Sequence, residues 1–257
     1  MGMVPGFGLE AFVSGQMMGF LLVFARLGSA LIFMPGFGES YVFARARLAL
    51  ALVICLALYP ATPVPPIPAD NLAMVARLMA AEVTVGLWIG LAARTIFTAL
   101  EFAGAQIGQV SGLANAFGPS LGSFQGATMV ATFLMVGGLA AMFATNTHYV
   151  IIRALLYSYQ VFPFGQPILG DMASQMVKAV QASFYIGLTL AAPFLVMGMI
   201  LNLGLGLANR MMPSLPVFFV AGSVLIGAGF LILSVAIPSM LATFLDRFSQ
   251  WFGSFVF

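Results

Sequence analysis

Few side chains in this sequence could carry out nucleophilic, acid–base or metal chemistry. The 257 residues include one histidine, His148, and one cysteine, Cys55. Zinc sites need clustered ligands, and the sequence contains no His-Glu-x-x-His motif. It also lacks a Gly-x-x-x-x-Gly-Lys-Ser/Thr loop, so any use of nucleotide energy must come from another protein. We therefore expect no catalytic site, no metal and no cofactor.

Glycines recur at a spacing of four residues, which leaves bare backbone along one face of a helix. This spacing lets a second helix approach closely. Packing between helices of the same chain accounts for most such pairs, so a single pair indicates no function. The glycines with this spacing are Gly15 and Gly19, Gly86 and Gly90, Gly104, Gly108 and Gly112, and Gly118, Gly122 and Gly126.

The stretch from Ser111 to Gly126 is rich in glycine, serine and asparagine, and its centre carries a turn signal, Asn115-Ala-Phe-Gly-Pro-Ser. No Asp, Glu, Lys or Arg occurs between residues 102 and 152. Non-helical backbone at membrane depth is tolerated only where protein buries it or where it lines a cavity. The stretch is therefore a candidate for a pore or gate.

Polar side chains also occur inside apolar runs. Asn202 and Asn209 are seven residues apart, on one helical face, and we expect both to face protein because an unpaired amide in lipid is costly. Glu82 and Arg94 could pair with other segments or with partner subunits. Alternatively, Arg26, Arg77 and Arg94 could extend their charged ends to the membrane interface.

The composition is that of an α-helical integral membrane protein. Hydrophobic residues make up 62% of the chain and charged residues only 6%, whereas soluble domains are about 25% charged. The apolar runs are too long for the roughly ten-residue strands of a membrane barrel. A net charge of +2 without a basic run argues against binding to nucleic acid.

Six apolar stretches are predicted to be helices: about 11–34, 48–59, 72–102, 127–152, 176–209 and 217–244. The second is short for a membrane span unless it begins near Val42. The proline-rich segment 60–68 is predicted to be a rigid, non-helical linker, because proline lacks a backbone donor and fixes φ.

Polar connections are predicted at 35–47 and 153–175, and a short break is predicted at 210–216. Pro193 is expected to kink or divide the fifth helix. Arg45 and Arg47 favour a cytoplasmic location for the first connection, while the other arginines leave the overall orientation open.

Several segments together resemble a known family. The run Leu-Asn-Leu-Gly-Leu-Gly-Leu-Ala-Asn-Arg-Met-Met-Pro-Ser-Leu-Pro-Val-Phe spans 201–218, and its Asn-Arg-Met-x-Pro part is the most specific. Asn146-Thr-His148 and Phe162-Pro-Phe-Gly165 precede it in the order that the family shows. With the segment 104–126, these motifs resemble the FliR family of flagellar biosynthetic proteins over essentially the whole chain.

The resemblance implies a non-enzymatic core subunit of the flagellar type III export gate, in the bacterial inner membrane and the flagellar basal body. FliR-like subunits close a helical assembly of FliP-like and FliQ-like subunits, associate with the FlhB-like switch protein and pass unfolded flagellar proteins. An ATPase complex and the proton motive force energise this export. The implied fold is all-α, with about six long apolar helices arranged as hairpins in one membrane domain over residues 1–257.

The resemblance also implies residue roles. The family's plug loop maps onto about 111–125, and Gly118 stands where the family often has an aspartate, so a charge there is not required. The loop residues are Ser111, Gly112, Asn115, Phe117, Gly118, Pro119, Ser120, Gly122 and Phe124. The helix-packing or subunit-contact residues are Gly104, Gly108, Asn202, Gly206, Asn209, Arg210 and Pro213. The residues with a structural role are Asn146, His148, Pro163 and Gly165.

Two alternatives remain open at this stage. The related virulence-type secretion subunit tends to have Ser-Arg where this chain has Asn209-Arg210, which favours the flagellar branch. A stand-alone transporter of small molecules is a second alternative, motivated by Pro193 and the arginines within apolar runs. Such a transporter would be supported by internal inverted repeats, and none is clear in this sequence.

Overall fold

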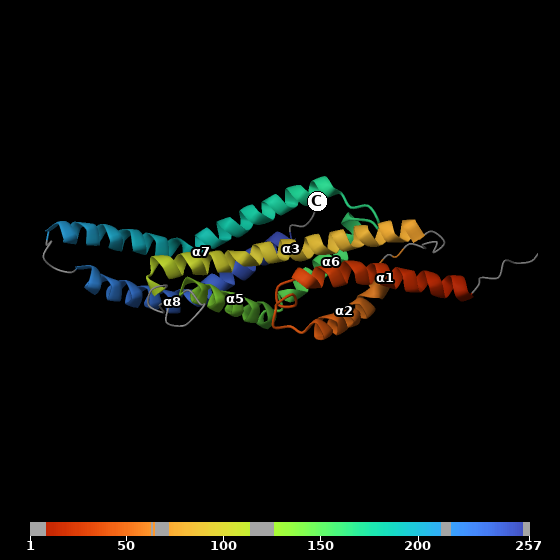
Figure 1. Ribbon diagram of the computed structural model, residues 1–257, viewed down its shortest axis with the longest axis horizontal. Helices are drawn as coiled ribbons and strands as arrows, with labels where there is room; N and C mark the ends of the chain where they lie inside the picture. Colours follow the sequence, from red (N-terminus) through yellow and green to blue (C-terminus); the bar gives the residue numbers. More distant parts are fainter. Residues whose placement is uncertain (1–8, 63, 65–71, 114–125, 212–216, 254–257) are drawn as a thin grey trace, which may run out of the picture. The chain divides into compact units, whose positions relative to one another are not determined.

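The computed structural model describes residues 9–62, 64, 72–113, 126–211 and 217–253, and regular structure within these ranges is entirely helical. Figure 1 shows the helices. Their lengths range from 14 to 43 residues, and helices are the form in which an apolar run satisfies its own backbone hydrogen bonds in lipid. In chain order they are α1 (Leu9–Phe33), α2 (Ala44–Leu58), the 3-10 turn η1 (Tyr59–Ala61), α3 (Leu72–Val110), α5 (Gly126–Ala144), α6 (His148–Val161), α7 (Leu169–Met211) and α8 (Val217–Gly253).

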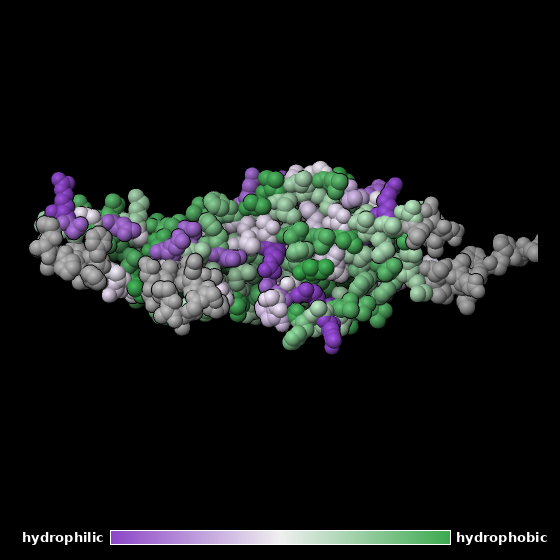
Figure 2. Space-filling model, viewed as in Figure 1, coloured by the Kyte–Doolittle hydropathy of each residue, from purple (hydrophilic) through white to green (hydrophobic). Residues whose placement is uncertain are grey.

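The helices have the length and apolar character of membrane spans. Five of those in the described residues are long and apolar enough to cross a membrane, or six if α5 and α6 together form one broken span. Hydrophobic side chains dominate the visible surface outside the grey atoms (Figure 2). The predicted all-α membrane fold is confirmed.

The predicted connection at 153–175 is wrong. Helix α6 continues to Val161 and α7 already begins at Leu169. Polar residues in this region indicate a loop. In the structure, however, Arg153 lies on an exposed helix face and Ser158 points into a buried cluster. The structure instead breaks the predicted helix 127–152 at Thr145–Thr147, between α5 and α6.

Pro193 does not divide its helix, and the predicted kink there stays a prediction. Helix α7 continues through Pro193 to Met211, so Arg210 is helical. Helix α8 contains Pro238 and extends to Gly253, nine residues beyond the predicted end at Phe244. Pro60 lies in η1, because a proline fits the first turn of a helix, where its missing N–H is not needed.

The chain divides into two compact units. Unit 1 comprises Met1–Arg94, Tyr149–Val177 and Gly253–Phe257, and unit 2 comprises Thr95–His148 and Lys178–Phe252. Helix α3 supplies residues to both units, and so does α7. Each unit has its own buried side chains.

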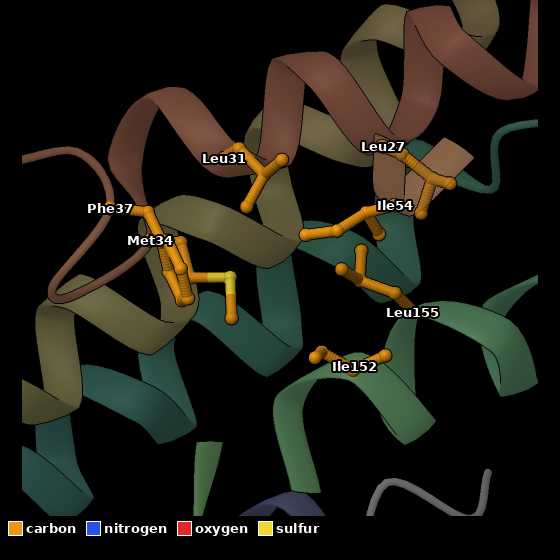
Figure 3. Close-up of a pocket in the computed structure, with 7 residues that line it drawn as sticks. All are labelled: Leu27, Leu31, Met34, Phe37, Ile54, Ile152 and Leu155. Atoms are coloured by element: carbon orange, nitrogen blue, oxygen red, sulfur yellow. The ribbon is translucent and has the colours of Figure 1, made fainter. Parts of the chain in front are cut away.

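The core of unit 1 is formed by α1, α2, α3 and α6, together with Met172 from the start of α7. The Trp88 indole N–H donates to the carbonyl oxygen of Met172 at 2.8 Å, and its ring meets Phe162 edge-on. One void of about 10 Å³, the size of a single water, remains between α1, α2 and α6. Figure 3 shows the apolar side chains that line it: Leu27, Leu31, Met34, Phe37, Ile54, Ile152 and Leu155.

The core of unit 2 is aromatic. Phe97 of α3 packs edge-on against Phe244 and Phe248 of α8, with ring centroids 5.0 and 5.9 Å apart. Helix α7 joins α3 through the Thr98 and Ser183 hydroxyls, which are 3.3 Å apart. These contacts fix the two long helices α7 and α8 against α3.

Candidate functional site

A fully buried ion pair joins α1 to α3 in unit 1. Nε of Arg26 donates to Oε2 of Glu82 at 2.7 Å, and a second guanidinium nitrogen donates to Oε1 at 3.1 Å. Both side chains are 0% exposed. This bidentate geometry is the strongest that an arginine and a carboxylate can form. The expectation that Arg26 extends to the interface is therefore wrong, whereas Glu82 does pair with another segment.

The same pair holds the connection between α6 and α7, which is the Phe162-Pro-Phe-Gly165 motif. Arg26 donates to the carbonyl oxygen of Phe162 at 2.9 Å, and the backbone N–H of Gly165 donates to Oε1 of Glu82 at 3.2 Å. Gly165 has φ of 74°, which favours glycine. A Cβ there would also overlap Leu78 of α3. The pair thus ties α1 and α3 to this motif.

Aromatic rings and a hydroxyl complete the surroundings of the guanidinium. Its central carbon lies 4.1 Å from the ring centre of Tyr159 and 5.6 Å from that of Phe164. The Ser158 hydroxyl accepts a fourth guanidinium hydrogen bond at 3.2 Å. A buried charge is tolerated when it is paired and hydrogen-bonded, as this one is. The cluster can hold helices in register.

A second ion pair lies at the connection between α1 and α2. Arg94 donates to Glu39 at 3.0 Å, with the two side chains 38% and 14% exposed. Arg47 donates to the carbonyl oxygens of Phe37 and Glu39 and so closes the connection. Burial and the neighbouring Glu39 carboxylate raise the pKa of Tyr41. Arg94 does not extend unpaired to the membrane interface, because it forms an ion pair within the chain.

The root of the predicted plug loop is tightly packed in unit 2. Ser111 and Gly112 follow α3, both are buried, and Gly112 has φ of 71°. A Cβ on Gly198 of α7 would overlap Val110, and one on Gly229 of α8 would overlap Ser111. The last turn of α3 is therefore held between two helices that approach it through glycines. The other predicted loop residues, Asn115, Phe117, Gly118, Pro119, Ser120, Gly122 and Phe124, lie outside the described residues.

Gly104 and Gly108 are buried on α3. A Cβ on Gly104 would overlap the backbone of Ala131 in α5. In unit 1, Gly86 and Gly90 of α3 lie against the carbonyl oxygens of Arg26 and Ala30 in α1 in the same way. At these positions the four-residue spacing serves packing between helices of the same chain.

Asn146 ends α5 in the left-handed conformation, with φ of 59°. The backbone N–H of Asn146 donates to the Phe143 carbonyl and that of Thr147 to the Met142 carbonyl. These two bonds form a Schellman motif, in which asparagine is tolerated at the left-handed position. The His148 ring lies 5.0 Å from that of Phe143 at the start of α6. Pro163 lies in the turn that follows α6.

The signature at the end of α7 is uncovered in the isolated chain. Asn202, Gly206, Asn209 and Arg210 are all exposed, and a Cβ on Gly206 would meet nothing within 4 Å. Pro213 lies outside the described residues. Within the part of the chain that the structure describes, these residues make no packing contact that would explain a dense motif, so their predicted role in subunit contact stays a prediction.

Comparison with known proteins decides the family. The profile of the family described as "Bacterial export proteins, family 1" matches residues 17–251. The chain is 36% identical to the flagellar biosynthetic protein FliR of Caulobacter vibrioides, over 89% of this chain and 92% of that protein. The chain belongs to the FliR family of bacterial export proteins. FliR of Bacillus subtilis is 29% identical over 90% of each chain.

A virulence-type member is a more distant relative of this FliR-family chain. The secretion system apparatus protein SsaT of Salmonella typhimurium is 27% identical over 69% of this chain and 72% of its own length. The FliR match from Caulobacter is stronger in both identity and coverage, which agrees with the flagellar branch. The buried cluster, the Schellman turn and the exposed α7 signature all fall within the residues that the family profile matches.

Proposed function

We propose that this chain is a non-enzymatic core subunit of the flagellar type III protein export gate, a multi-pass protein of the bacterial inner membrane and the flagellar basal body. Membership of the FliR family over residues 17–251 supports the export role. The long apolar helices support the location in a membrane. The chain assembles with other parts of the export apparatus, and we take its partners to be FliP-like and FliQ-like subunits and the FlhB-like switch protein.

The observation that carries this proposal is the length of the exposed apolar face on α7. Exposed hydrophobic side chains follow one another from Val180 to Met211. At 1.5 Å per residue they extend over about 47 Å, whereas the hydrocarbon core is about 30 Å thick. To place all of them in lipid, α7 would have to tilt by about 50°, beyond the usual range. Part of this face therefore lies outside the hydrocarbon core, where contact with protein would shield it from water.

The asparagines indicate which part of α7 that is. Asn202 and Asn209 lie near its C-terminal end, exposed among apolar side chains. A side-chain amide in lipid has no hydrogen-bond partner, whereas a neighbouring helix can provide one. The last part of α7 is thus the surface that a partner subunit covers, as expected for one component of a larger assembly.

Replacing Asn202 and Asn209 with leucine should uncouple folding from assembly. Both side chains are exposed, so the isolated chain should keep its thermal midpoint in detergent. Interhelical hydrogen bonds in membranes contribute about 0.6–2 kcal/mol each, so recovery of the partners should fall about threefold to thirtyfold per bond. The measurement is affinity purification of the tagged chain in mild detergent, with quantification of the co-purified subunits.

The control for that experiment is Val53→Ala, a change at an exposed apolar position of α2 rather than on the apolar face of α7. Recovery of the unsubstituted chain without FliP-like and FliQ-like partners would overturn the proposed function. Equal recovery of partners by the asparagine double variant would overturn only the role of these two residues.

We also propose that the loop 111–125 is the plug of the gate. Its small residues allow several backbone conformations, and Phe117 and Phe124 can seal a dry constriction.

Deleting residues 118–122 should raise ion leakage across the inner membrane of cells that still assemble the complex. Leakage that stays at the wild-type level in an assembled complex would contradict the plug. The packing of the loop root supports the proposal, since Ser111 and Gly112 lie against α8 and Val110 lies against Gly198 of α7.

A further inference from the structure

Helix α2 is the least covered of the candidate spans. Only 11% of Ala44–Ala61 is buried, the smallest share among the spans in the described residues. Ala51 and Cys55 are the buried residues of α2. Leu48, Leu52 and Leu56 follow one another at four-residue spacing, and their side chains are 53%, 42% and 68% exposed. They form an exposed apolar stripe on α2.

The stripe is much shorter than the apolar face of α7. From Leu48 to Leu56 it extends over about 12 Å as a helix, which fits within one leaflet of a hydrocarbon core about 30 Å thick. Polar or aromatic residues border the stripe at both ends. Arg45 and Arg47 lie at its start, and Tyr59 lies at its end with its hydroxyl bonded to Gln16. Arginine and aromatic residues where an apolar stripe begins are typical of the membrane interface.

The end of unit 1 at which α2 begins is basic. Four arginines and one glutamate gather there, for a net charge of +3: Arg45, Arg47, Arg94, Arg153 and Glu39. Ile152 lines the same void as Met34 and Phe37, which places the first turn of α6, and with it Arg153, at this end (Figure 3). Hydrophilic side chains gather around the start of α2 in Figure 2.

Two of these arginines make no bond to another residue that the structure describes, so they can meet a ligand. Arg47 is bound to backbone carbonyls and Arg94 to Glu39. Arg45 and Arg153 are exposed. Exposed aromatic rings lie beside them: Tyr41 is 65%, Phe43 82% and Tyr149 59% exposed. Amphipathic aromatic rings with arginines between them are suited to the headgroup layer.

We propose that α2 faces the lipid bilayer directly, and that the basic end of unit 1 binds anionic phospholipid headgroups through Arg45 and Arg153. The stripe of Leu48, Leu52 and Leu56 contacts acyl chains, and Tyr41, Phe43 and Tyr149 lie at headgroup level. The excess of arginine places this end in the cytoplasmic leaflet. The inference rests on the membrane location of the chain and does not depend on which subunits join it.

Spin labels on α2 test the lipid contact. The chain has one cysteine, so Cys55→Ala provides a background for single labels at positions 43, 51, 52 and 56. The labelled chain is reconstituted into bilayers together with whatever subunits co-purify. Labels at 52 and 56 should collide often with oxygen and rarely with a water-soluble nickel complex, and the label at 43 should lie shallower. The label at the buried position 51 should be protected from both.

Two results would overturn the inference. Protection from both reagents at 52 and 56 would mean that protein covers α2, and frequent collision with nickel would mean that water does. Loss of co-purified export subunits would count against the proposed function and leave the collision pattern of α2 interpretable. If Cys55→Ala lowers the yield, Cys55→Ser gives the same background.

Lipid preference tests the headgroup contact. Spin-labelled phosphatidylglycerol should associate with the protein more strongly than spin-labelled phosphatidylcholine, and Arg45→Gln should reduce the ratio about two- to fivefold. Lys178→Gln is the matched control, because it removes one exposed positive charge from α7, and it should leave the ratio unchanged. Equal losses in the two variants would indicate a general charge effect and contradict a site at the start of α2.

Discussion

Replacing Glu82 with leucine should remove nearly all folded chain from the membrane. The substitution leaves the Arg26 guanidinium at 0% exposure without its carboxylate. Breaking a buried pair by removing one partner costs about 3–5 kcal/mol, which is a large part of the 5–15 kcal/mol that stabilises a typical domain. The measurements are the steady-state amount of chain in isolated membranes and the thermal midpoint of what can be purified.

The chain supplies its own control in the second ion pair. Arg94 and Glu39 are 38% and 14% exposed, and pairs in such surroundings contribute about 0–1 kcal/mol. Arg94→Gln should therefore change the amount of chain in the membrane only slightly. Similar losses in Glu82→Leu and Arg94→Gln would contradict the special role of the buried pair.

A double variant separates the charge from the hydrogen bonds. In Arg26→Met with Glu82→Leu no buried charge is left, and apolar replacements of buried pairs are often tolerated. The double variant should recover part of the loss. It should not recover all of it, because the Phe162 carbonyl and the Gly165 N–H lose their partners. The remaining deficit measures how much the cluster contributes by holding the turn between α6 and α7.

Composition and motif order predicted the fold class and the family. Apolar runs of about 20 residues leave little choice but membrane helices, and the structure confirms them. Boundaries were less predictable. Pro193 was expected to kink or divide its helix, and α7 is not divided there. Prolines are tolerated inside membrane helices, so a proline alone does not fix a helix boundary in such a sequence.

The buried cluster shows where sequence reasoning stopped. Arg26 and Glu82 were each visible as charges in apolar runs, but they are 56 positions apart, and nothing local links them. The available signal was the family motif at 162–165, whose backbone turned out to be the third partner of the pair. A buried charge needs a partner of opposite sign, so a buried Glu82 implies an arginine nearby. Only the three-dimensional structure shows which arginine that is.

Replacing glycine with alanine should have opposite effects on stability at Gly86 and at Gly204. Gly86→Ala should destabilise the chain, because the added Cβ would overlap the Arg26 carbonyl and the Ser29 hydroxyl of α1. Backbone cannot move aside as a flexible side chain can, so we expect a cost near the upper end of the roughly 1–3 kcal/mol typical of overpacking. The displaced α1 would also carry Arg26 away from Glu82.

Gly204→Ala should have no such cost in the isolated chain, because a Cβ there meets nothing within 4 Å. Replacing a glycine by alanine inside an exposed helix gains up to about 1 kcal/mol from helix propensity. The thermal midpoints of the two purified variants should therefore move in opposite directions from that of the unsubstituted chain. A loss of stability in both, or in neither, would mean that close approach of α1 and α3 at Gly86 does not hold unit 1 together. If Gly204→Ala stabilises the isolated chain but reduces recovery of partners, the open side of α7 at this glycine is itself covered in the assembly.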